Sequence, residues 1–161
     1  MSLTNYELII LCKFYNIELH GVFMKDELPK KQGIGNYIIN LDSSTGNGTH
    51  WCCFIKSSNN DYLYFDSFGC VPPNSVSTFF KGKYGFNNWI IQDFKSNYCG
   101  FFCLGLFHHI AHDSSSSTLY EKANNYINMF KSNTLLNDNI LRKYFKKLPY
   151  KNCPILISKL F

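Results

Sequence analysis

The sequence predicts a single domain, residues 1–161, that combines β-strands with helices. Hydrophobic residues make up 45% of the chain, with 15 Phe and 11 Tyr, which suits a folded core and argues against disorder. Two short segments rich in aromatic and β-branched residues, at 51–56 and 62–66, predict strands. Apolar segments that open with helix-capping residues lie on both sides of this pair and predict helices.

The two central segments are predicted to form a β-hairpin around the polar turn 57–61. If the tip lies near Ser58, Phe54 is opposite Tyr62 and His50 is opposite Asp66. Directly opposed residues of antiparallel strands share a face and lie close together. The hairpin therefore brings an imidazole and a carboxylate together at its open end. A carboxylate beside a histidine fixes its tautomer and raises its basicity, as a catalytic base requires.

The other elements follow from capping residues and apolar patterns. Thr4 and Glu7 form a capping box at the start of a helix that runs to Tyr15, and Thr118 and Glu121 form a second one. We further expect a surface loop at 19–29, a strand at 36–41 beside the first hairpin strand, a flexible Ser/Gly/Asn loop at 42–49, a short helix at 76–80, a strand at 89–94, and helices at 99–111, 118–130 and 138–148.

Cysteine content and charge limit the compartment and the partners. Seven cysteines, without the spacing of a zinc site or a disulfide framework, predict free thiols in a reducing intracellular compartment. The first 16 residues lack the features of a secretory signal, and no apolar run is long enough to cross a bilayer. The net charge of +5 comes from 15 Lys and one Arg. A lysine group at 143, 146, 147 and 151 is interpreted as a solvated helix face, with DNA contact the less favoured interpretation.

Cys99 is the candidate nucleophile because it lies where an Asn-containing loop meets a strongly helical segment. The positive end of a helix dipole favours a thiolate, and free N–H groups in the first turn can receive an oxyanion. Gly100 permits close approach of a substrate backbone. Gln92, at the end of the predicted strand 89–94, can donate a second hydrogen bond to the developing negative charge.

Each of these residues also has an ordinary structural interpretation. A cysteine in a helix is commonly a small buried residue, which suits Cys103 and the thiols at 12, 52, 53, 70 and 153. His108 and His112 share a helix face at a spacing that can bind zinc, but no third ligand is evident. A histidine cluster stabilised by the helix dipole is therefore favoured there. We predict no metal at the site.

Four segments together resemble the adenain family of viral maturation proteases and the related SUMO and ubiquitin-like proteases. They are Gly48–Trp51 (GTHW), Tyr64–Gly69 (YFDSFG), Gln92, and Asn97–Cys103 (NYCGFFC). The order His, Asp, Gln, Cys and the seven-residue step from Gln92 to Cys99 match, and the resemblance extends over residues 1–112. Similar proteases are encoded by virophages and Maverick/Polinton-type elements.

This resemblance implies an α+β fold, with a mixed central sheet flanked by helices and a papain-like site whose cysteine opens a helix. Cys99 is then the nucleophile, His50 the general base and acid, and Asp66 the residue that orients His50, in place of the glutamate of adenain. Gln92 and the Cys99 N–H form the oxyanion hole. Trp51 packs beside the histidine, and Gly48, Trp51 and Gly100 are expected to contact substrate.

The resemblance further implies a cysteine endopeptidase that cuts virion or capsid precursors near glycine, in the host cytoplasm or virus factory and in the virion. We expect a monomer that needs no cofactor. Adenain uses a peptide and DNA as activators, and neither is indicated here. The alternatives are a deubiquitinase or SUMO/Ubl-specific protease, an acetyltransferase that uses the same triad, and an inactive binding module of the same fold.

Overall fold

The fold is α+β and is built on a mixed five-stranded sheet. The computed structural model describes residues 2–57, 61–80, 84–115, 117–149 and 152–161. Within them the strands are β1 (Leu19–Met24), β2 (Gly35–Asn40), β3 (Trp51–Lys56), β4 (Tyr62–Phe65) and β5 (Gly85–Phe86), which lie in that order across the sheet. The outer pairs β1–β2 and β4–β5 are parallel, whereas β3 is antiparallel to both of its neighbours.

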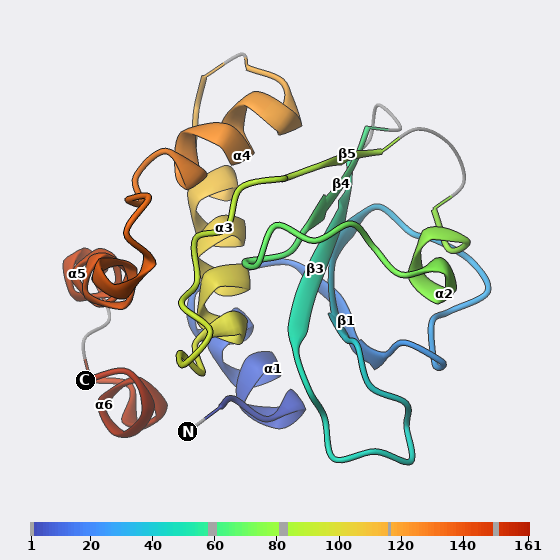
Figure 1. The fold of residues 1–161 in the computed structure, drawn as a ribbon, viewed down its shortest axis with the longest axis horizontal. Coiled ribbons are helices and arrows are strands. Elements are labelled where there is room, and N and C mark those ends of the chain that lie inside the picture. Colours follow the sequence, from blue (N-terminus) through green and yellow to red (C-terminus); the bar gives the residue numbers. More distant parts are fainter. Residues whose placement is uncertain (1, 58–60, 81–83, 116, 150–151) are drawn as a thin grey trace.

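Helices cover one face of the sheet, and a smaller apolar cluster covers the other (Figure 1). The first layer contains α1 (Asn5–Phe14), α3 (Cys99–His112), α4 (Leu119–Ile127), α5 (Asn137–Lys147) and α6 (Pro154–Lys159). On the opposite face, α2 (Asn74–Ser77) packs with the aromatic side chains that follow it. Cys53 and Ile55 of β3 face the large helical core, and Cys52 and Phe54 face the smaller cluster. Because both faces of the sheet are covered, the side chains of β3 are almost all buried.

Sequence patterns predicted most of these elements. Both capping boxes form, at Thr4 and at Thr118, and α1 and α4 begin directly after them. The strand 36–41 is confirmed beside the first hairpin strand, as are the helices at 99–111 and 138–148 and the short helix near 76. Of the turn 57–61, residues 58–60 lie outside the described residues.

Two predicted segments are wrong. Residues 19–24 form the edge strand β1 and not a loop, and they pair in parallel with β2. A single strand with a histidine and a glycine in it lacks the alternation that signals a half-buried strand, so its pairing was not visible in the sequence. Residues 89–94 form no strand. They form a loop that is held by the buried side chain of Ile91 and by its backbone, since the N–H groups of Ile91 and Gln92 both donate to the Ser67 carbonyl, at 2.9 and 3.0 Å.

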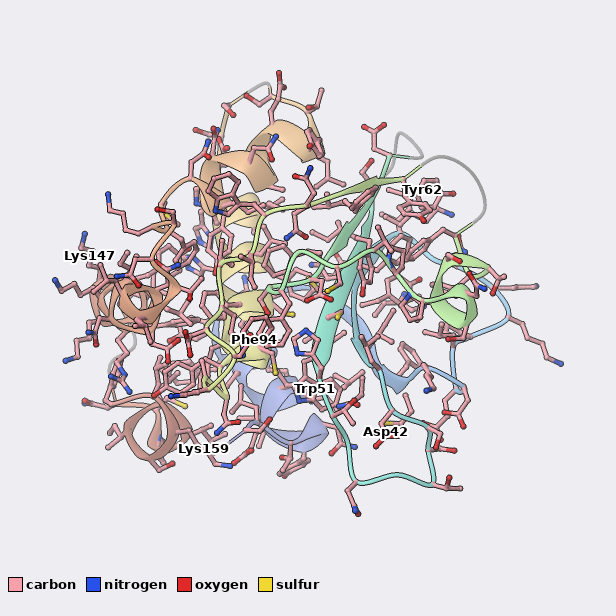
Figure 2. All side chains as sticks on the ribbon, in the orientation of Figure 1. Asp42, Trp51, Tyr62, Phe94, Lys147 and Lys159 are labelled. Atoms are coloured by element: carbon pink, nitrogen blue, oxygen red, sulfur yellow. The ribbon has the colours of Figure 1, made fainter. Side chains whose placement is uncertain are left out.

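The C-terminal surface is basic, as predicted from the helix pattern. Lys143, Lys146 and Lys147 are exposed on α5, and Figure 2 shows Lys147 pointing away from the body of the protein. Lys151, the fourth member of this predicted group, lies outside the described residues. Short α6 was not predicted, although it begins at a proline in the first helical turn, where proline is favoured. Among the described residues, no helix has the length and apolar character needed to cross a membrane.

Candidate active site

His50 and Asp66 form a hydrogen-bonded pair at the open end of the hairpin. His50 immediately precedes β3 and Asp66 immediately follows β4. His50 Nε2 donates to Asp66 Oδ1 at 2.8 Å, and the Phe68 N–H donates to the same oxygen, also at 2.8 Å. The Asp66 side chain is only 2% exposed. A buried carboxylate that accepts two hydrogen bonds has a fixed position, so it orients the ring of His50. Because Nε2 is bonded to Asp66, Nδ1 is the ring nitrogen that can interact with a thiol.

The pair forms although the predicted strand register is wrong. Phe54 pairs with Tyr64 and not with Tyr62, so the register differs by two residues from the prediction. Continued past the strand end, this register sets His50 opposite Phe68. The two rings stack, with centroids 4.6 Å apart. A shift of two residues leaves every side chain on its original face, so Asp66 remains a diagonal neighbour of His50.

Asn87 holds the backbone of Asp66 and was not singled out by the sequence. Its side chain is almost fully buried. It accepts from the Asp66 N–H at 2.9 Å and donates to the Asp66 carbonyl at 2.6 Å. The amide thus imitates the backbone of a further β5 residue and extends the sheet to the end that bears Asp66. The only signal in the sequence is an asparagine within an apolar stretch, which is too common to assign.

Cys99 lies at the N-terminus of α3, as predicted. Tyr98 precedes it as the N-cap residue and provides no side-chain hydrogen bond, whereas α1 and α4 have complete capping boxes. The first N–H groups of α3 therefore face the site without a side-chain cap. Such groups, at the positive end of the helix dipole, can bind a developing negative charge.

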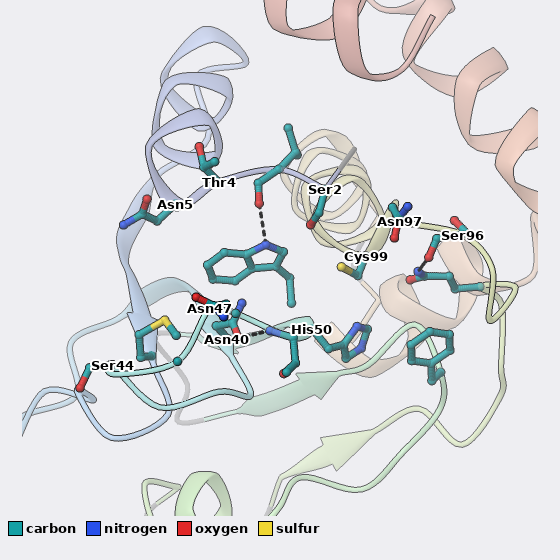
Figure 3. A pocket seen from close by; sticks show the side chains of 18 of the residues that line it. Ser2, Thr4, Asn5, Asn40, Ser44, Asn47, His50, Ser96, Asn97 and Cys99 are labelled. Atoms are coloured by element: carbon teal, nitrogen blue, oxygen red, sulfur yellow. Dashed lines mark hydrogen bonds between the residues drawn. The ribbon is translucent and has the colours of Figure 1, made fainter.

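Cys99 and His50 interact across the site (Figure 3). Burial alone lowers the pKa of His50, but the hydrogen bond to Asp66 and the interaction with the Cys99 sulfur outweigh burial and raise the pKa to about 9. At neutral pH the imidazole is therefore protonated.

Gln92 is buried and oriented by two hydrogen bonds. Ser67 Oγ donates to its Oε1 at 2.6 Å, and its Nε2 donates to the Ser96 carbonyl at 2.8 Å. The serine hydroxyl fixes which end of the amide carries the nitrogen, and one N–H of Nε2 stays available after the bond to Ser96. Gln92 and Cys99 line the same groove. The structure thus brings together all four predicted catalytic residues.

The groove has a volume of about 860 Å³ and runs past His50 and Cys99 between the N-terminal segment, the 42–49 loop and the 92–98 loop. The 42–49 loop is tied back to the sheet, because Asn40 Oδ1 accepts from the N–H groups of Asp42 and Thr49 at 3.0 Å each. Gly48 lines the groove at a φ of +83°, a conformation that favours glycine. The predicted flexibility of this loop stays a prediction.

Trp51 and Gly100 have structural roles that the sequence did not indicate. The Trp51 indole lines the groove but is 6% exposed, and it donates to the Leu3 carbonyl at 2.8 Å, which fixes the N-terminal segment beside the site. Gly100 is buried, and a Cβ there would lie 3.1 Å from Leu8 and 3.3 Å from Leu3. Close packing against α1 therefore accounts for this glycine. Its predicted contact with substrate stays a prediction.

The other thiols are mostly structural. Cys103 is fully buried and its Sγ donates to the Trp51 carbonyl at 3.6 Å. Burial also raises the pKa of Cys103 well above its ordinary value. The thiols at 12, 52, 53 and 153 are buried as predicted, but the prediction is wrong for Cys70, which is exposed.

Among the described residues, one group has metal-ligating atoms close together. Atoms of His50, Cys52 and Asp66 lie within 4.8 Å of one another. Burial raises the pKa of Cys52 well above its ordinary value, which opposes the thiolate that a metal requires. The 2.8 Å separation of His50 and Asp66 is that of a direct hydrogen bond. These donors fit proton transfer better than metal binding.

The histidine cluster at the end of α3 packs by ring stacking and by a hydrogen bond to Tyr144. His108 and His112 stack with centroids 4.1 Å apart, and His108 Nδ1 lies 2.8 Å from the Tyr144 hydroxyl. Burial, reinforced by His112 and His109, lowers the pKa of His108 to about 4. Stabilisation of a charged His108 by the helix dipole, as the sequence suggested, is therefore wrong for this residue.

No protein-family model matches the chain, and no significant match was found among curated proteins.

Proposed function

We propose that this protein is a cysteine endopeptidase. The observation that carries the proposal is that Cys99, the His50–Asp66 pair and Gln92, which come from four separate segments, line or border one groove. A nucleophile, a base with its orienting acid, and an oxyanion donor are the parts that acyl transfer by a thiol requires.

The chemistry follows from the positions of these groups. The Cys99 sulfur attacks the carbonyl carbon of a peptide bond as a thiolate, with its proton held on His50, and a new S–C bond forms. The carbonyl oxygen becomes negative and accepts from the Cys99 N–H and Gln92 Nε2. The C–N bond then breaks, and protonated His50 gives its proton to the leaving amine. Water, deprotonated by His50, hydrolyses the thioester and restores the thiol.

We also propose the finer assignment to the adenain-like and ubiquitin-like protease fold, with virion or capsid precursors cut near glycine as substrates. Its support is the order and spacing of the four site residues and the placement of Cys99 at the start of a helix packed on a mixed sheet. Release of a ubiquitin-like tail is the competing outcome. To distinguish the two activities, the protein is incubated with a capsid precursor and with a ubiquitin-like precursor, and the new termini are sequenced.

The activity itself is tested with a peptide that carries a thiol-reactive group at its C-terminal carbonyl. We expect labelling at Cys99 that is lost in Cys99→Ala and retained in Cys70→Ala, because Cys70 is exposed but lies outside the groove. Gln92→Ala should lower the rate of peptide cleavage roughly a hundredfold. Labelling that follows Cys70, or unchanged cleavage by Cys99→Ala, would refute the proposal.

A further inference from the structure

The N-terminal segment, residues 2–5, forms one side of the groove. All four residues line it, and Figure 3 shows Ser2 on the side opposite to His50. Leu3 is only 3% exposed, and its side chain packs beside Gly100 in the first turn of α3. Before α1 begins, the segment has no regular secondary structure. Contacts with other elements must therefore hold it in place.

Two successive backbone carbonyls of this segment accept hydrogen bonds from different parts of the fold. Trp51 Nε1, at the start of β3, donates to the Leu3 carbonyl at 2.8 Å. Lys159 Nζ, in the last turn of α6, donates to the Ser2 carbonyl at 3.1 Å. Figure 1 shows α6 beside the N-terminal end of the chain. The sheet and the C-terminal helix thus hold the same wall of the groove.

Lys159 also ties the start of α1 to α6. Its Nζ lies 3.1 Å from each carboxylate oxygen of Glu7, which forms the capping box with Thr4. Burial alone would raise the pKa of Glu7, but hydrogen bonds from Thr4 and Lys159 outweigh burial and lower the pKa, so the carboxylate is charged at neutral pH. The two side chains are 16% and 20% exposed. Salt therefore screens this pair less than it screens a fully exposed one.

The helix that carries Lys159 has a fixed position of its own. Leu156 and Leu160 are buried in the large helical core. Arg142 Nε, from α5, donates to the Leu160 carbonyl at 2.9 Å. Because α6 is anchored independently of the N-terminal segment, the ammonium group can hold that segment in place.

We propose that Lys159 is a positioning residue of the active site, which holds the N-terminal segment as a wall of the groove. This inference rests on the proposed function, since the wall borders the groove in which we place the substrate. Lys159 acts through the Ser2 carbonyl and Glu7 and does not touch the reacting atoms. A wall that positions the substrate contributes alike to binding of the ground state and of the transition state. Its loss should therefore raise KM more than it lowers kcat.

The position of the wall is measured by the fluorescence of Trp51, whose indole binds the Leu3 carbonyl. The chain has two tryptophans, so Trp89→Phe leaves Trp51 as the only one. In that background, Lys159→Met keeps most of the aliphatic stem and removes the ammonium group. It should raise the acrylamide quenching constant of Trp51 several-fold and shift its emission to longer wavelength. Lys159→Arg keeps a cationic donor and should restore values near those of the parent protein.

Peptide cleavage tests the consequence for the site. Lys159→Met should raise KM about tenfold with a nearly unchanged kcat. A merely structural role gives the opposite result, because a smaller folded fraction lowers the apparent kcat and leaves KM unchanged. Lys147→Met is the matched control, since Lys147 also lies in the last turn of a helix but is exposed and outside the groove. It should change neither KM nor the quenching of Trp51.

A second variant addresses the other partner of Lys159. Glu7→Gln keeps an acceptor in the capping box but removes the charge, and should change KM and quenching in the same direction by less. Unchanged quenching of Trp51 in Lys159→Met, or an unchanged KM, would overturn the role of Lys159 and leave the peptidase standing. If the wild-type protein cleaves nothing and Cys99 is not labelled, the proposed function falls, and the positioning role falls with it whatever the quenching shows.

Discussion

The charge state of His50 gives the sharpest test of the site, through the substitution Asp66→Asn. The pKa of His50 is raised from 6.5 to about 9, and the Asp66 carboxylate is the largest cause acting in that direction. At 1.36 kcal/mol per pKa unit, the raised pKa corresponds to about 3 kcal/mol of folding free energy. Because the folded pKa is higher than the unfolded one, this contribution is complete below pH 6.5 and is lost as the pH rises through about 9. Without the carboxylate this cause is lost, and the pKa of His50 falls.

Urea unfolding of wild-type protein and Asp66→Asn at pH 6, 7.5 and 9 measures this contribution. The difference in unfolding free energy between the two proteins should be largest at pH 6 and shrink towards pH 9. Taking the difference cancels groups that titrate alike in both proteins. Asp61→Asn is the control, because it removes an exposed carboxylate at the opposite end of the hairpin. A difference that does not depend on pH would refute the assignment of the raised pKa to this pair.

Three further predictions concern groups that hold the site in place. Asn87→Ala leaves the Asp66 N–H without its buried partner and should lower the unfolding free energy by about 1–3 kcal/mol, measured by urea denaturation, and slow alkylation of Cys99 by iodoacetamide at pH 7. Gly69→Ala should cost about 1–3 kcal/mol by the same denaturation, since φ is +69° and the new Cβ would lie 2.9 Å from backbone. Asp138→Ala removes the acceptor of the Ser96 hydroxyl and should lower kcat/KM several-fold with a nearly unchanged melting temperature. A large fall in the melting temperature together with the fall in kcat/KM would indicate a merely structural role.

Local sequence was sufficient to predict the His50–Asp66 pair and the position of Cys99. Cys99 could be placed because the loop residues before it and the apolar run after it mark a helix start. The histidine and the carboxylate could be paired because a hairpin is a local structure with a two-residue period. The register error of two residues did no harm for that reason, whereas an error of one would have sent His50 and Asp66 to opposite faces.

What sequence reasoning missed depends on contacts between distant segments. The strand β1 owes its conformation to parallel pairing with β2, and a parallel partner leaves no turn signal between the two. Asn87 acts by bonding a backbone 21 residues away, and any asparagine has the same groups. The apolar stretch 89–94 has the composition of a strand, but the carbonyl of Ile91 is taken by the side chain of Asn137 and not by a neighbouring strand. Composition cannot reveal which partner a backbone group will find.

The C-terminal helices belong to the site, although the sequence resemblance ended near residue 112. Asn137 is fully buried and donates to the carbonyl of Ile91, one residue before Gln92, the proposed oxyanion donor. Arg142, the one arginine of the chain, stacks over the ring of Tyr98, one residue before Cys99, and donates to the carbonyl of Leu160. Contacts on both sides of the 92–98 loop thus fix the distance between the amide of Gln92 and the first turn of α3. Because the proposed oxyanion hole depends on that distance, we expect the described part of the C-terminal helical segment, residues 131–149 and 152–160, to support the proposed catalysis by position and not by chemistry.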